Sequence, residues 1–219
     1  MIKTGAKFRQ RAVRPVATLL IAASAALALQ GCAGVVLGTA VMTSLAATDR
    51  RTLGAQTEDK AIFLKAQPAA RRAAGESSNV NVTSFNRQVL LTGEVRDEAT
   101  KAAVEREVAR VDGVLSIVND IAVTMPSSLA SRSNDTLITG KVKASFVDAK
   151  DIFANSIKVV TERGNVYLMG RVTEREGQRA AEVASRVGGV QKVVKVFDYI
   201  TEAELQGLAQ TPGNTQSGR

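Results

Sequence analysis

The chain has 219 residues, of which 45% are hydrophobic, 4% aromatic and 23% charged, and its formal net charge is +8. It has no histidine and one cysteine, which excludes a Ser-His-Asp triad, a histidine metal cluster, an intramolecular disulfide and a CxxC metal site. Five basic residues and no acidic residue precede Cys32, and the rest of the chain carries 24 basic and 21 acidic residues. That balance is too weak to predict a nucleic-acid partner.

The first 31 residues have the three parts of a bacterial secretory signal: a basic start, a short apolar run over 15–29, and small residues around the cysteine. The segment Leu29-Gln-Gly-Cys32 is similar to the lipobox of bacterial lipoproteins. There the thiol takes a diacylglyceryl group, and cleavage before the cysteine frees an amine that is acylated in turn. We therefore expect a lipoprotein signal peptide at 1–31, covalent lipid on Cys32 and no other cofactor.

Two alternatives for this region stay open. Cys32 is an inert buried thiol in one, and residues 16–47 form an uncleaved membrane-spanning helix in the other. In the lipoprotein reading, residues 32–50 form an acylated tether along the membrane. Ala33 follows the cysteine in place of the aspartate that commonly retains such proteins in the inner membrane, so the family rule predicts the periplasmic face of the outer membrane.

The rest of the chain contains two copies of one unit of about seventy residues. The segment VLLTGEV at 89–95 matches VYLMGRV at 166–172, and Asp59-Lys-Ala-Ile62 matches Asp135-Thr-Leu-Ile138. We expect the units at 51–124 and 134–201, joined by a linker at 125–133 and followed by a flexible polar tail at 202–219.

Each unit is predicted to contain a helix, a hairpin, a charged helix and a last strand. In the first unit, Pro68 interrupts the opening helix, the hairpin turns at Asn86-Arg87, a helix follows over 97–111, and the last strand covers 114–123. In the second unit, the helices cover 135–146 and 174–187, the hairpin turns at 163–165, and the last strand covers 190–200. Gly93 and Gly170 indicate close backbone approach within the second strands. The fold class is α+β, with a three-stranded mixed sheet and two helices on one face in each unit.

Several segments carry a resemblance to the dual BON-domain outer-membrane lipoproteins: 47–49, 53–56, 133–136, 168–170 and 172–175. The resemblance runs from Leu29 to about Ile200. It implies two tandem BON domains, a role in envelope integrity, enrichment at the division site, and candidate partners in outer-membrane assembly.

The opening helix of the second unit is the candidate lipid-binding site. Leu137, Lys141 and Ala144 form a stripe beside the expected core positions, with Lys143 nearby. Exposed apolar side chains next to lysines suit the surface of an anionic bilayer. The competing interpretation is an ordinary solvated face on which Leu137 folds against a neighbour.

The resemblance implies that this helix binds anionic phospholipid such as phosphatidylglycerol, with leucine here in place of an aromatic residue. We assign the site to Leu137, Lys141, Lys143, Ala144, Phe146 and Val147. The first unit is expected to be less suited, since Pro68 interrupts its helix and Ala61 occupies the position of Leu137.

Enzymatic activity is not expected. The acidic residues beside strand ends and helix starts are assigned to capping and solubility, because nothing in the sequence fixes two of them in one cleft: Asp49, Glu58, Asp59, Glu94, Asp97 and Glu98. The alternative to lipid binding is a periplasmic scaffold that docks on an outer-membrane assembly or envelope-stress partner, and a soluble BON protein is a third possibility. The oligomeric state stays open.

Overall fold

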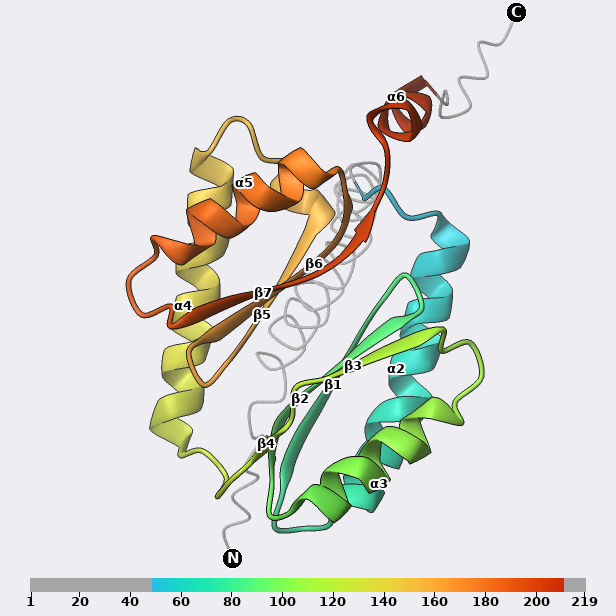
Figure 1. The fold of residues 1–219 in the computed structure, drawn as a ribbon, viewed down its shortest axis with the longest axis vertical. Coiled ribbons are helices and arrows are strands. Elements are labelled where there is room, and N and C mark those ends of the chain that lie inside the picture. Colours follow the sequence, from blue (N-terminus) through green and yellow to red (C-terminus); the bar gives the residue numbers. More distant parts are fainter. Residues whose placement is uncertain (1–48, 211–219) are drawn as a thin grey trace, which may run out of the picture. The chain divides into compact units, whose positions relative to one another are not determined.

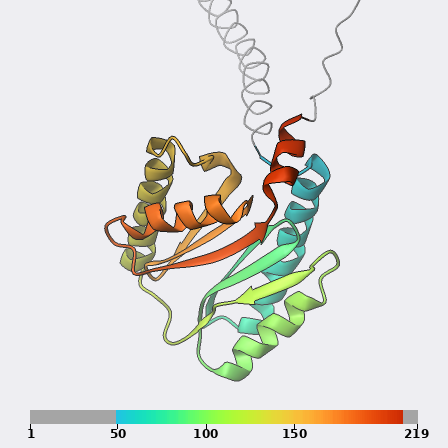
Figure 2. The ribbon, with the colours of Figure 1, turned by 45° about the horizontal axis from the view of Figure 1, so that its top comes forward.

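A computed structural model describes residues 49–210, which fold as two α+β units along the chain (Figure 1). In chain order the elements are α2 Leu53–Ala74, β1 Asn79–Phe85, β2 Gln88–Val95, α3 Glu98–Ala109, β3 Ser116–Asn119, β4 Ala122–Val123, α4 Leu129–Asp148, the 3-10 helix η1 Ala154–Ser156, β5 Ile157–Glu162, β6 Asn165–Val172, α5 Glu174–Ser185, β7 Lys192–Tyr199 and α6 Glu202–Gln210. Each unit has two helices on one face of its sheet (Figure 2). The predicted α+β class and tandem organisation are confirmed.

The two sheets share one topology, with the second strand in the centre. Strands β1 and β5 pair antiparallel with β2 and β6, and β3 and β7 pair parallel with them. Both hairpins turn through two residues with positive φ, Asn86 (50°) and Arg87 (65°), then Arg163 (54°) and Gly164 (74°). That backbone matches the right-handed twist of the strands, so the predicted hairpins are confirmed.

The last strand of the first sheet is split, whereas the sequence predicted one strand over 114–123. Strands β3 and β4 both pair with β2, and the gap between them lies opposite the part of β2 that contains Gly93, whose φ is +110°. A Cβ at Gly93 would lie 1.9 Å from the Asn79 carbonyl oxygen. A Cβ at Gly170 would likewise lie 2.5 Å from the Ser156 carbonyl oxygen, but Gly170 does not have positive φ, and β7 is continuous.

A buried aspartate in the opening helix of each unit holds the hairpin turn. Asp135 accepts hydrogen bonds from the amides of Arg163 and Gly164 at 2.9 and 2.8 Å. Asp59 accepts from the amides of Asn86 and Arg87 at 2.7 and 2.8 Å. These equivalent contacts show that the sequence repeat is also a repeat in structure.

Each unit has its own aliphatic core between helices and sheet. Ile62, Val89, Leu91, Val104 and Val108 are central to the first. The corresponding cluster in the second unit is built around Ile138, Val142, Phe146, Val166 and Leu168.

A third apolar cluster joins the opposite faces of the two sheets. Phe85 and Leu90 of the first unit pack with Tyr167, Met169 and Val196 of the second. Polar contacts border the cluster: the Asn81 amide donates to Glu162 at 3.0 Å, and the Asn86 amide donates to Asp198 at 2.8 Å. Both faces of the central strands are therefore buried, and the described residues 49–210 belong to one compact unit.

Four boundaries differ from the sequence prediction. Helix α2 continues through the exposed Pro68, because its inner face is buried both before that residue, at Ile62 and Ala66, and after it, at Ala69 and Ala70. Helix α4 begins at Leu129, inside the predicted linker, where the Ser128 side chain caps it. The predicted tether ends before residue 50, since Arg50 forms a bidentate ion pair with Glu176 at 2.7 and 2.8 Å.

The fourth difference is the start of the predicted flexible tail, which is helical as α6. The Thr201 hydroxyl accepts from the Glu204 amide at 3.1 Å, and the Glu204 carboxylate accepts from the Thr201 amide at 2.7 Å. This reciprocal cap satisfies two backbone donors and starts the helix. Within residues 49–210, no helix combines the length and apolar content that crossing a bilayer requires.

Candidate functional site

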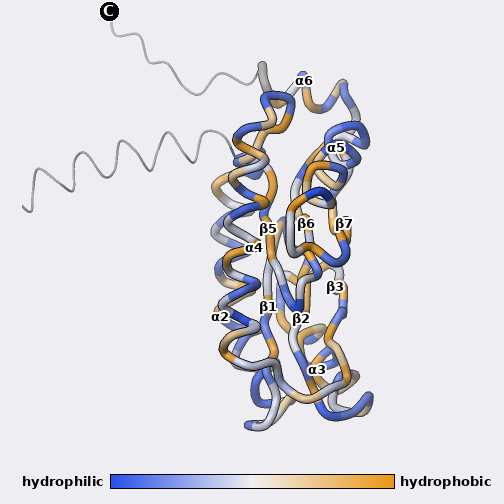
Figure 3. The backbone as a smooth tube through the Cα atoms, turned by 90° about the vertical axis from the view of Figure 1, so that its left-hand side faces the viewer, coloured by the Kyte–Doolittle hydropathy of each residue, from blue (hydrophilic) through white to orange (hydrophobic). Residues whose placement is uncertain are grey.

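Helix α4 is amphipathic because its core contacts recur every four residues. Ile138, Val142 and Phe146 are each at most 1% exposed and lie in the core of the second unit. Asp135 continues the same face one turn earlier. The helix lies beside strand β5 (Figure 3), where the Thr139 hydroxyl donates to that of Thr161 at 2.7 Å. The packing fixes which residues of α4 face solvent.

The outward face of α4 carries an apolar stripe. Leu137 is 63% exposed and Val147 is 72% exposed, and Gly140 and Ala144 between them are also exposed. Successive residues of an α-helix turn by about 100°, so these four positions fall on one side, directly opposite the core residues. Leu137 therefore does not fold against a neighbour, as the competing interpretation required.

Lys141 and Lys143 flank this stripe on its two sides, and both are exposed. The acidic residues of α4 are Asp135, which is buried, and Asp148, in the last turn. From Leu137 to Ala144 the outward face carries positive charge only, and the exposed Asp148 lies on the same side one turn after Ala144. Long lysine stems allow the ammonium groups to reach lipid phosphates while apolar neighbours enter the interface.

Five of the six predicted site residues lie together on this exposed face: Leu137, Lys141, Lys143, Ala144 and Val147. The assignment of Phe146 is wrong, because its side chain is 1% exposed and packs in the core. It lies four residues after Val142, so helical periodicity puts it on the inner face. Cys32 lies outside the described residues.

Phe153 is an exposed aromatic residue that the sequence left unassigned. It is 67% exposed, and the Arg50 guanidinium lies 5.3 Å from its ring centroid. The contact joins residues about a hundred positions apart, so no local pattern could have revealed it.

A shallow cleft of about 520 Å³ opens beside Lys141 and Ala144, between α4 and the end of α5. Its lining includes Asp148, Val187 and Arg186. The cleft offers one further cation near the apolar stripe, although Arg186 is already paired with Glu182. It can accept a polar headgroup beside α4 but has no enclosed cavity for a cofactor.

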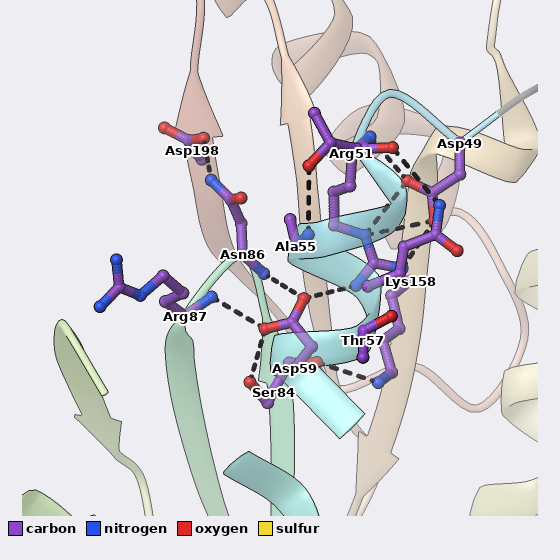
Figure 4. Close-up of polar contacts among 12 residues, drawn as sticks. Asp49, Arg51, Ala55, Thr57, Asp59, Ser84, Asn86, Arg87, Lys158 and Asp198 are labelled. Carbon is purple, nitrogen blue, oxygen red and sulfur yellow. Dashed lines mark hydrogen bonds and ion pairs between the residues drawn. The ribbon is translucent and has the colours of Figure 1, made fainter. Parts of the chain in front are cut away.

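Five of the six acidic residues weighed as catalytic pairs have structural partners, the sixth being Glu98. Asp59 is 4% exposed and accepts hydrogen bonds from Ser84 and Arg51, both at 2.7 Å, in addition to the turn amides (Figure 4). Arg51 also pairs with Asp49 at 2.6 Å, and its guanidinium stacks 4.1 Å from the Phe85 ring centroid. This network ties the start of α2 to the hairpin.

The other carboxylates behave similarly. Glu58 pairs with Arg87 at 3.2 Å, and Glu94 accepts from the Asn79 side chain at 3.1 Å. Asp97 caps α3, and this hydrogen bonding to Thr100 lowers the pKa of the Asp97 carboxyl. Across residues 49–210, no group of three acidic, histidine or cysteine side chains is arranged to hold a metal ion.

Comparison with known proteins gives a consistent result. The BON domain family model matches residues 64–125 and 134–201. The chain is 36% identical to outer membrane lipoprotein DolP of Haemophilus influenzae over 85% of this chain and 97% of that protein. It is 30% identical to a 21 kDa hemolysin of Actinobacillus pleuropneumoniae, covering 69% and 79% of the two chains.

A more distant relative is osmotically-inducible protein Y of Escherichia coli, 27% identical over 54% of this chain and 60% of that protein. Among solved structures, a type III secretion protein of Chlamydia trachomatis matches 70% of this chain and 99% of its own at a TM-score of 0.27 and 12% identity, which is too low to support an argument. Each of the two family matches falls on one of the two folded units. The alignment with the Haemophilus protein covers nearly all of that protein. The chain therefore belongs to the BON domain family, as a dual-BON protein of the DolP type.

Proposed function

We propose that the protein is an outer-membrane lipoprotein, anchored through lipid on Cys32, whose folded part faces the periplasm and binds anionic phospholipid through α4. The name of the Haemophilus relative supports the location. The observation that carries the lipid-binding proposal is the exposed stripe of α4, in which Leu137 and Val147 face directly away from the core between Lys141 and Lys143.

Binding energies explain why we assign membrane anchoring to the lipid on Cys32 and lipid recognition to the folded part. A single acyl chain binds membranes with a constant of only about 10⁴ M⁻¹, and further chains make attachment effectively permanent. The folded part then needs only weak contacts, since the anchor keeps its local concentration near the bilayer high. We propose a non-enzymatic function that supports envelope integrity at sites rich in anionic lipid, including the division site.

The test uses the mature chain with Cys32→Ala, so that no acyl chain contributes. This protein should sediment with vesicles of phosphatidylcholine and phosphatidylglycerol and should be released by salt, which screens surface charges. Lys141→Glu plus Lys143→Glu should strongly weaken sedimentation. Arg106→Glu plus Lys192→Glu changes the net charge equally at exposed positions outside α2 and α4, and should retain sedimentation. Equal loss in both variants would mean that only net charge matters and that α4 is not the site.

The anchor has a separate test. Palmitate should label the native protein and not the Cys32→Ala variant. An unmodified residue 32, or a leader still attached in the native protein, would remove the lipoprotein part of the proposal.

A second candidate function is a scaffold for an outer-membrane assembly partner. Met125 and Leu129 are 74% and 76% exposed, and they lie at the two ends of the segment Met-Pro-Ser-Ser-Leu that leads from the first unit into α4. If this function is the correct one, the α4 variants bind vesicles like the parent chain while changes at Met125 and Leu129 produce the envelope defect.

A further inference from the structure

Helix α2 of the first unit has the same outward design as α4. Its buried face comprises Asp59, Ile62, Ala66, Ala69 and Ala70. Turning about 100° per residue, the opposite face carries Leu53, Ala61, Leu64 and Pro68. All four are exposed, and the fractions for Leu53 and Leu64 are 72% and 65%.

A position-by-position comparison of the two units in sequence does not reveal this exposed face of α2, and the structural repeat explains why. Because Asp59 and Asp135 make equivalent contacts, Ala61 corresponds to Leu137 and Leu64 to Gly140. Because Ala61 occupies the position of Leu137, the first unit was expected to be less suited to lipid binding. Its exposed leucine, Leu64, lies about one turn further along the same stripe.

The charge of α2 complements an anionic surface. Lys60, Lys65, Arg71 and Arg72 are exposed along the helix, and from residue 60 to its end at Ala74 there is no acidic residue. Both acids of α2 are engaged elsewhere, Glu58 by Arg87 and Asp59 by Arg51. Lys65 meets Asp112 at 3.7 Å, but the two side chains are 57% and 93% exposed, so that pair is weak.

Lysines from both units also meet at one cleft beside α2. This cleft, of about 370 Å³, is lined by Lys60, Phe63, Ser84 and Lys158, together with the paired Arg51 and Asp59. The Lys158 ammonium donates to the Ser84 carbonyl at 3.3 Å. Although Lys158 as a residue is exposed, desolvation by the surrounding protein, followed by the charge of Arg51, lowers its pKa. A phosphate at this cleft would relieve that unfavourable environment.

We propose that α2 is a second surface for an anionic phospholipid bilayer, with Leu53 and Leu64 entering the interface and the cleft at Lys60 and Lys158 receiving a lipid phosphate. The inference rests on the proposed function of α4 for the nature of the partner, but it concerns separate residues. It also fits the chain order, because α2 is the first helix after residue 49 and begins 21 residues beyond the proposed anchor at Cys32.

The test places one thiol at a time in the Cys32→Ala chain, which contains no other cysteine. An environment-sensitive fluorophore is attached at Leu64→Cys, at Leu137→Cys, or at Ala102→Cys on the exposed face of α3 as control. With vesicles containing phosphatidylglycerol, the probes at positions 64 and 137 should shift to the blue and the probe at 102 should not. A response at 137 without one at 64 overturns the inference and leaves the proposed function standing.

The remaining outcomes are also decisive. If neither probe shifts to the blue, both the inference and the proposed function are contradicted. A shift at position 64 alone supports the inference and excludes α4 as the lipid-binding site. Lys60→Glu plus Leu64→Glu should weaken vesicle binding about 30-fold, equivalent to about 2 kcal/mol at 1.4 kcal/mol per tenfold. Ala102→Glu plus Arg106→Glu has the same spacing and charge change on α3 and should have little effect. Equal weakening in both pairs would overturn the inference.

Discussion

Leu137→Glu gives the sharpest quantitative test of lipid binding by α4. Burying a whole leucine side chain is worth about 1.5–3 kcal/mol. Leu137 is 63% exposed in the free protein, so about 1–2 kcal/mol is available when it enters a bilayer. A glutamate in its place also meets repulsion from anionic lipid of about 1 kcal/mol. The affinity of the Cys32→Ala chain for phosphatidylglycerol vesicles should therefore fall by about 30–150-fold.

The chain provides a matched control for this change. Leu115 is 69% exposed, and it lies in the loop before β3, outside both α2 and α4. Leu115→Glu therefore alters hydrophobicity and charge by the same amount on another surface, and its vesicle titration should match that of the parent chain. Both variants should also retain the parental melting temperature, because neither leucine is buried. The reasoning is refuted if the two substitutions weaken binding equally.

Three further predictions concern the fold, and denaturant unfolding checks each. Asp59→Ala should destabilise by about 2–4 kcal/mol, more than Asp135→Ala, because Asp59 also binds Arg51 and Ser84; equal losses would show that the additional bonds contribute nothing. Gly93→Ala should cost at least about 2 kcal/mol, since its Cβ would clash with the Asn79 oxygen; a neutral result would mean that β2 relaxes freely. Burial raises the pKa of Glu162 above its ordinary value of 4.5, so the folded state binds more protons and its stability falls as pH rises through the folded pKa. Glu162→Gln should flatten this slope above pH 4.5 and stabilise the protein at neutral pH, and an unchanged slope would exclude Glu162 as its source.

Local chemistry accounts for what the sequence predicted correctly. The hairpins depend on neighbouring residues that accept positive φ, such as Asn86 and Gly164, and the helices follow from apolar spacing and caps. A local capping signal was also present in the segment that was wrongly predicted to be a flexible tail. Thr201-Glu-Ala-Glu204 is a capping box, and it starts a helix in the predicted tail.

Tertiary contacts account for the remainder. The joining of the two sheets depends on residues far apart in sequence, such as Phe85 with Tyr167. A partial signal was present, since VLLTGEV and VYLMGRV are more continuously apolar than a strand with one solvated face requires. The spacing of α4 was enough to place Phe146 inside, yet only the packed structure shows how fully Leu64 and Leu137 project outward.

The proposed anchor and helices predict an asymmetry in cells. In the proposed arrangement, three acyl chains on Cys32 would hold the protein permanently and α4 would add only a few kcal/mol, so fractionation should respond to the anchor alone. Cys32→Ala behind a general secretory signal that is cleaved without lipidation should release the protein from the membrane fraction, and Leu137→Glu with Cys32 intact should not. A probe in α4 should still lose its contact with lipid in the Leu137→Glu protein, because the tether sets the distance to the bilayer but not the docking of the helix. Release by Leu137→Glu alone would show that the folded domain, and not Cys32, holds the protein at the membrane.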